Sequence, residues 1–202
     1  MKNIVLLVGI ETVRGKDGKV IKLSETFVNN ARTFEKDNRK DHVIRIDARN
    51  YLTADNPIGE LWHDVCMSYG HNEGLAIDEL IYMGHSDSTT LYVFSRVCTE
   101  HPDEQRFLSS YSDFTAPYNK NAAIRLISCQ AGGERGKKFD DCIAQTIADQ
   151  TKRTVYAYTS RCAQIRRRDG GFEQRPDYPG FAKFVARADA NAPSGEVPES
   201  AK

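Results

Sequence analysis

The sequence has no long hydrophobic run, no excess of either charge and no closely spaced pair of cysteines. No apolar stretch approaches the roughly 20 residues of a membrane-spanning helix, so the sequence predicts no membrane partner. Its 28 lysines and arginines balance its 28 aspartates and glutamates. Because a surface that binds nucleic acid usually carries a basic excess, this balance predicts no nucleic-acid partner either.

The five cysteines are scattered along the chain, and none belongs to a C-x-x-C pair. The sequence therefore indicates neither a zinc ribbon nor a thioredoxin-type motif, and we expect no metal and no cofactor. An odd number of scattered cysteines favours a reducing compartment. The short apolar segment 3–10 is followed by Glu11 rather than by a small-residue cleavage site. Together these features predict a cytoplasmic protein, or one exported without a cleaved signal.

Apolar runs typical of buried strands alternate along the chain with segments that have the spacing of amphipathic helices. The expected strands are 3–10, 43–46, 79–83, 122–128 and 154–159, with a short strand or hairpin arm at 89–94. The expected helices are one with Ser24 as N-cap and three over 57–70, 137–150 and 181–187. This alternation predicts an α/β domain over residues 1–190, with a mostly parallel sheet flanked by helices. The polar segment 191–202 is expected to be a disordered tail.

Two residues with reactive side chains follow expected core strands. His85 comes after the strand 79–83, and Cys129 comes after the strand 122–128. Functional sites in parallel sheets form at the carboxyl ends of the strands. If these strands are neighbours, at a spacing of about 4.8 Å, the imidazole of His85 lies near the thiol of Cys129. A histidine in that place can deprotonate the thiol and later protonate a leaving group.

Two stretches resemble a known family, namely LIYMGHS at 80–86 and IRLISCQAGG at 124–133. Caspase-like (clan CD) cysteine peptidases, which include caspases, metacaspases and gingipains, have a hydrophobic strand ending in His-Gly. A later strand in that family ends in a small residue and cysteine. The resemblance extends to the order of elements over 3–160, and it implies a three-layer caspase-like fold. It also implies a thiol protease that cleaves protein or peptide substrates through a thioester, with Cys129 as nucleophile and His85 as general base and acid.

The resemblance further implies an oxyanion hole made by the backbone N–H groups of Cys129 and Ser86, where Ser86 replaces the family's glycine. The family's substrate pocket draws on residues after the fifth strand, where Arg161 and Arg166 lie. An arginine there could clamp an acidic substrate side chain with two hydrogen bonds. Asp87 could instead favour a basic side chain. The sequence leaves this choice open, as it does the oligomeric state.

Two other functions are compatible with the sequence. One is a caspase-like binding module without catalytic activity, since Ser86 stands where the family has glycine. The other is a serine hydrolase that uses Ser86, because residues 84–88 (GHSDS) nearly match the G-x-S-x-G nucleophile elbow. That motif needs a helix after the serine and a histidine much later in the chain. Here His101 follows too closely, and 89–94 favours extended structure.

Overall fold

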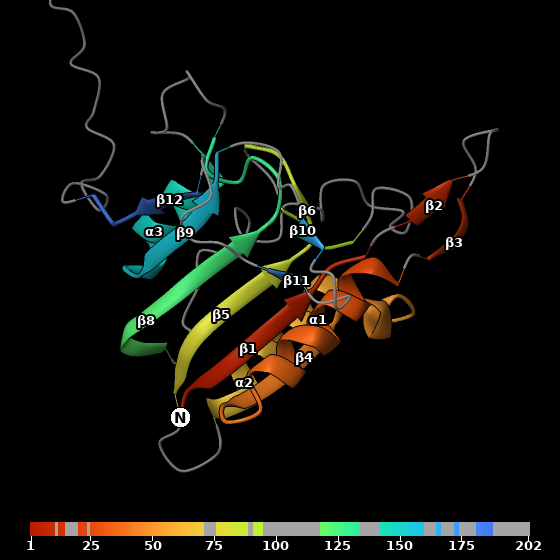
Figure 1. The fold of residues 1–202 in the computed structure, drawn as a ribbon, viewed down its shortest axis with the longest axis horizontal. Helices are drawn as coiled ribbons and strands as arrows, with labels where there is room; N and C mark the ends of the chain where they lie inside the picture. The colour runs from red at the N-terminus through yellow and green to blue at the C-terminus, as the bar shows by residue number, and fades with distance from the viewer. Residues whose placement is uncertain are drawn as a thin grey trace, which may run out of the picture.

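The computed structural model describes residues 1–10, 12–14, 20–23, 25–70, 76–88, 91–94, 118–133, 142–159, 165–166, 172–173 and 181–187. A six-stranded sheet forms the centre of the molecule (Figure 1), in the order β12-β9-β8-β5-β1-β4. Its strands are β1 (Asn3–Val8), β4 (His42–Asp47), β5 (Ile77–Met83), β8 (Tyr118–Ile127), β9 (Thr154–Tyr158) and β12 (Phe181–Phe184). The helices are α1 (Thr26–Asp37), α2 (Pro57–Gly70), α3 (Ile143–Thr151) and a 3-10 turn, η1 (Ala48–Tyr51).

All neighbouring strands of the sheet are parallel except β12, which runs antiparallel to β9. Counted along the chain, the parallel strands stand in the order 2-1-3-4-5, an order known from doubly wound α/β sheets. The winding direction changes between β1 and β5. In such sheets ligands bind beyond the carboxyl ends of the strands near this switch point, which is where the chain leaves β5 toward His85.

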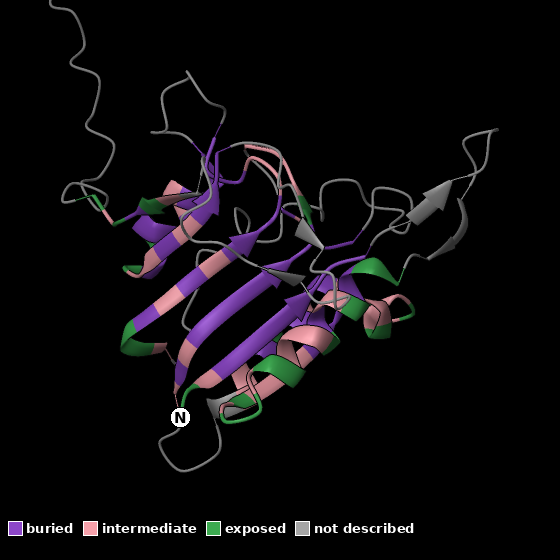
Figure 2. Cartoon of the chain, in the orientation of Figure 1, coloured by how far each residue is buried: buried purple, intermediate pink, exposed green. Residues whose placement is uncertain are grey.

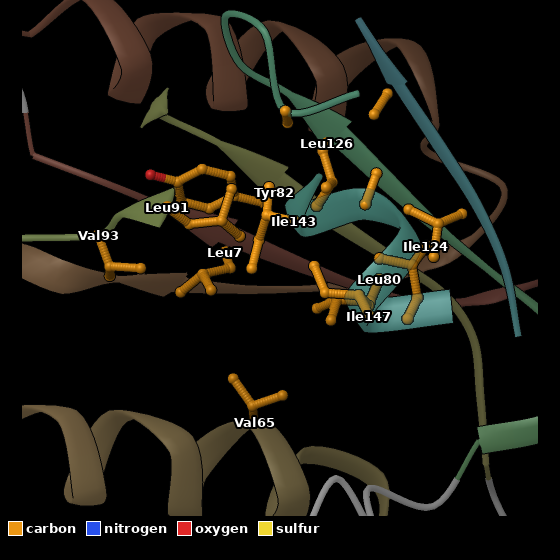
Figure 3. Close-up of a cluster of buried hydrophobic side chains, with 14 of the residues drawn as sticks. Leu7, Val65, Leu80, Tyr82, Leu91, Val93, Ile124, Leu126, Ile143 and Ile147 are labelled. Carbon is orange, nitrogen blue, oxygen red and sulfur yellow. The ribbon is translucent and has the colours of Figure 1, made fainter. Parts of the chain in front are cut away.

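Helices cover both faces of the sheet, because alternate residues of each strand point to opposite sides. On one face the sheet packs against α2 and α3, and Figure 3 shows this cluster, with Leu7, Leu80, Tyr82, Ile124 and Leu126 of the sheet facing Val65, Ile143 and Ile147. On the other face the strands pack against Phe27, Val28 and Ala31 of α1. The central strands are buried along most of their length (Figure 2). The predicted α/β architecture with a mostly parallel sheet and flanking helices is therefore confirmed.

In the described part of the chain, three antiparallel pairs of short strands lie outside the central sheet. They pair β2 (Thr12–Arg14) with β3 (Val20–Leu23), β6 (His85–Ser86) with β7 (Leu91–Tyr92), and β10 (Ile165–Arg166) with β11 (Phe172–Glu173). β7 lies within the short strand or hairpin arm expected at 89–94, of which residues 89–90 lie outside the described residues. None of the helices in the described part of the chain is long and apolar enough to cross a membrane.

The prediction of a helix over 181–187 is wrong. Phe181–Phe184 forms β12, which pairs with β9 in the register Phe181 to Tyr158 and Phe184 to Val155. In so short a segment the pairing with a distant strand outweighs local helix propensity. The third helix, predicted over 137–150, is described from Ile143 on, and residues 137–141 lie outside the described residues. The predicted N-cap Ser24 and the predicted tail 191–202 also lie outside them.

Candidate active site at the ends of β5 and β8

The sheet brings the His85 and Cys129 segments side by side, as strands β5 and β8 are neighbours. Their register runs to Met83 opposite Ile127, and the N–H of Gly84 continues it by donating to the carbonyl of Ile127 at 3.4 Å. Beyond this point the hydroxyl of Ser86 donates to the carbonyl of Cys129. The two segments that the sequence singles out are therefore in direct contact.

His85 lies at the surface and is held from both faces of the sheet. Its imidazole packs edge-on against the ring of Phe27 in α1, with 5.0 Å between ring centroids and 75° between ring planes. Its backbone carbonyl accepts a hydrogen bond from the hydroxyl of Tyr82, at 2.9 Å. His85 also pairs with Tyr92 across the β6–β7 hairpin. An exposed imidazole with a fixed backbone can exchange protons with a bound substrate.

Cys129 opens a tight turn that is anchored to the neighbouring strand β9. The next residue, Gln130, has φ of 57°, a left-handed conformation that is uncommon outside glycine. Its carbonyl accepts from the N–H of Gly133 at 2.8 Å, and the N–H of Gly132 donates to Tyr158 at 2.9 Å. Strained residues of this kind often occur at functional sites. The turn leaves Cys129 half-buried.

The N-terminus of α3 binds both segments. The N–H of Ile143 donates to the carbonyl of Ser88 at 2.7 Å, and the N–H of Ala144 donates to the carbonyl of Ala131 at 3.0 Å. The first N–H groups of a helix have no partner inside the helix, so these two carbonyls satisfy them. One rigid element therefore fixes the loop after His85 relative to the turn after Cys129.

The described cysteines differ in their surroundings. Cys66, Cys129 and Cys142 carry thiols rather than disulfides, and Cys98 and Cys162 lie outside the described residues. Burial raises the pKa of the Cys66 thiol, and burial is also the main cause of the raised pKa of Cys142. Because the thiolate is the reactive form, we expect Cys66 and Cys142 to be poor nucleophiles at neutral pH.

Ser86 has a structural partner, which bears on both roles considered for it. Its hydroxyl donates a hydrogen bond to the carbonyl of Cys129. Ser86 lies in β6, which leads into β7 rather than into a helix. The nucleophile elbow requires a strand, a tight turn and a helix, so this part of the fold does not have the form of a serine hydrolase site. Among the described non-glycine residues only Gln130 and Lys152 have positive φ. Serine therefore fits the backbone at position 86 without strain.

Of the three predicted substrate-binding residues, the structure describes Asp87 and Arg166 but not Arg161. Asp87 is half-buried and accepts a hydrogen bond from the hydroxyl of Tyr92. Arg166 belongs to β10, which pairs with β11. β11 in turn contacts α1, and Phe27 of α1 packs against His85. Arg161 lies outside the described residues. Within the described part of the chain, no three His, Cys, Asp or Glu side chains form a group that could hold a metal ion.

Sequence reasoning treated Tyr82 only as part of an apolar strand, and it missed the hydrogen bond to His85. The signal available was a tyrosine, whose polar end needs a partner when buried, two residues before a glycine at the strand end.

Comparisons with known proteins do not assign the chain to a family. A scan against profiles of protein families finds no match, and no curated protein matches the sequence.

Proposed function

We propose that the chain is a caspase-like cysteine endopeptidase in which His85 and Cys129 form the catalytic dyad. The observation that carries the proposal is the contact between the two strand-end segments, where the Ser86 hydroxyl binds the Cys129 carbonyl. This contact ties the residue after His85 to the backbone of Cys129, at the carboxyl edge of a parallel sheet. The choice of chemistry rests on the sequence resemblance described above.

In the proposed reaction His85 takes the proton of the Cys129 thiol, and the thiolate attacks the carbonyl carbon of the scissile peptide bond. The backbone N–H groups of Cys129 and Ser86 would stabilise the oxyanion. Protonated His85 gives its proton to the leaving amine, which leaves a thioester on Cys129. Water, deprotonated by His85, then hydrolyses the thioester and regenerates the thiol. The substrate is a protein or peptide, and the setting is the cytoplasm.

The nature of the favoured substrate side chain depends on which charged groups line the pocket. Asp87 stands two residues after His85 and would attract a basic side chain. Arg161 and Arg166, in the segment after β9, would instead bind an acidic one through paired hydrogen bonds. Of the two, we propose an acidic substrate side chain, since a guanidinium matches a carboxylate in geometry as well as in charge.

A binding module without catalysis is the second candidate. It is favoured by Ser86, which stands where the related peptidases have glycine and whose hydroxyl is engaged with the backbone of Cys129. Such a protein would bind peptides at the same edge of the sheet and leave them intact.

The test is cleavage of a mixed peptide library, followed by mass spectrometry. Wild-type protein and the Cys66→Ala variant are expected to cleave the same peptides, because Cys66 lies on α2 and outside the site. Cys129→Ala and His85→Ala are expected to cleave none. Equal cleavage by Cys129→Ala and wild type would exclude the thiol mechanism. If wild type binds library peptides but does not cleave them, the binding module becomes the better description.

A further inference from the structure

Tyr82 is a buried tyrosine whose ring reaches from the core to the end of its own strand. It lies in the middle of the sheet on β5, opposite Leu7 of β1 and Leu126 of β8. Only 1% of its surface is exposed, and its ring packs on the face covered by α2 and α3 (Figure 3). Its hydroxyl donates to the carbonyl of His85 at 2.9 Å. The hydroxyl of Tyr82 thus contacts the backbone of His85, the candidate general base.

Two glycines provide the space for the ring. A Cβ on Gly84 would lie 2.2 Å from the Tyr82 hydroxyl oxygen and 2.4 Å from Cζ. A Cβ on Gly9 would lie 3.1 Å from the same oxygen. Gly9 also donates from its N–H to the carbonyl of Met83 at 2.8 Å, which ties the end of β1 to the end of β5. Glycine at both strand ends therefore lets the backbone approach the Tyr82 hydroxyl closely, because glycine has no Cβ.

The hydroxyl of Tyr82 stays protonated, and so remains a hydrogen-bond donor, as pH changes. Burial raises the pKa of Tyr82 well above its ordinary value, so the hydroxyl keeps its proton throughout the pH range in which a histidine and a thiol titrate. The bond to the His85 carbonyl therefore does not depend on the ionisation of the site. Phe27 packs against the His85 ring from the opposite face of the sheet, so backbone and imidazole are held from different sides.

We propose that Tyr82 is a positioning residue, which fixes the backbone of His85 so that the imidazole is directed at Cys129. This inference rests on the proposed function of the His85–Cys129 pair. Tyr82 touches neither a substrate nor the reacting atoms, and it acts through the peptide group of His85. Loss of its hydroxyl leaves the ring and its packing in place but frees that peptide group to rotate.

The experiment compares Tyr82→Phe with Tyr118→Phe, which is a matched control. Tyr118 lies at the start of β8, at the opposite end of the sheet, and its buried hydroxyl has no hydrogen-bond partner within the described structure. The readouts are the rate of Cys129 alkylation by iodoacetamide as a function of pH, and kcat and KM for a cleaved peptide. His85→Ala is measured in parallel.

We expect Tyr82→Phe to lower kcat about 2- to 12-fold with little change in KM, as a hydrogen bond contributes about 0.5–1.5 kcal/mol. The rate of Cys129 alkylation at neutral pH should fall toward the rate measured in His85→Ala. Tyr118→Phe should change neither quantity. A Tyr82 with a purely structural role would alter the melting temperature without moving the alkylation profile.

The outcomes separate the two proposals. If His85→Ala shifts the Cys129 profile and Tyr82→Phe does not, Tyr82 has no positioning role and the catalytic pair stands. If neither variant shifts the profile, the proposed function fails, and the role of Tyr82 fails with it. A shift in Tyr82→Phe that Tyr118→Phe shares would show a general effect of removing a buried hydroxyl, and would overturn the positioning role.

Discussion

Substitution of Gly84 by alanine tests how tightly β5 is built around Tyr82. The added Cβ would overlap the phenol, at 2.2 Å from its oxygen, 2.4 Å from Cζ and 2.9 Å from Cε2. The ring has little room to retreat, since Tyr82 is 1% exposed and sits between two paired strands. Overpacking of a close-packed core typically costs about 1–3 kcal/mol. We expect Gly84→Ala to fall at the upper end of that range, since the overlap is with a rigid ring.

Gly59→Ala provides a control with a nearly identical overlap. Its Cβ would lie 2.3 Å from Nδ2 of Asn56, but that side chain is exposed and can turn away. Asn56 caps α2 by accepting from the N–H of Gly59 at 3.1 Å, so a displaced side chain loses up to about 1 kcal/mol. Alanine regains about 1 kcal/mol over glycine in a helix. The two effects offset each other, and Gly59→Ala should be close to wild type.

Urea unfolding followed by the fluorescence of the single tryptophan, Trp62, measures both variants. Trp62 is 6% exposed in the native state, so its emission should change when the chain unfolds. A third variant, Tyr82→Leu, removes the ring that Gly84 accommodates, and in that background Gly84→Ala should cost much less than in wild type. A free energy of unfolding for Gly84→Ala within about 0.5 kcal/mol of wild type would refute the packing argument.

Two ion pairs lead to further predictions. Burial alone would raise the pKa of Asp149, but hydrogen bonds from the backbone and guanidinium of Arg187 lower it below its ordinary value. Its contribution to stability is therefore present above the unfolded-state pKa of about 3.9 and is lost as pH falls through the folded-state pKa. The deficit of Asp149→Asn relative to wild type, measured by urea unfolding, should shrink below about pH 4, and a constant deficit would contradict this. Arg125→Ala should cost about 3 kcal/mol, since it removes the main partner of buried Glu79, whereas removal of exposed Lys2 should cost less than about 1 kcal/mol. Equal losses in the two variants would show that Arg125 is not the main partner of Glu79.

The elements with strong local signals could be predicted from the sequence. Proline at the first position, five apolar residues on one face and a terminal glycine define α2, and the helix spans the predicted residues 57–70. The buried strands are apolar over most of their length, which made β1, β5, β8 and β9 recognisable. In these segments local propensity and tertiary packing favour the same structure.

Features that depend on long-range pairing could not be predicted. The segment Phe181–Phe184 is too short for its pattern to separate a helix from an edge strand, and only its pairing with β9 decides. The contact between the segments that follow β5 and β8 required these strands to be neighbours, which is a property of the sheet order and not of either strand. The fit of Tyr82 between Gly9 and Gly84 involves two strands far apart in sequence, so the sequence shows the three residues without their contact.

The most direct test of the proposed catalytic pair is the rate of iodoacetamide modification of each cysteine against pH, measured by mass spectrometry in wild type and His85→Ala. We expect Cys129 to react fastest at neutral pH, and to lose this advantage in His85→Ala. Cys66 and Cys142 should react slowly, because burial raises the pKa of both thiols. If Cys129 reacts no faster than Cys66 and its rate does not change in His85→Ala, the two residues do not form a catalytic pair.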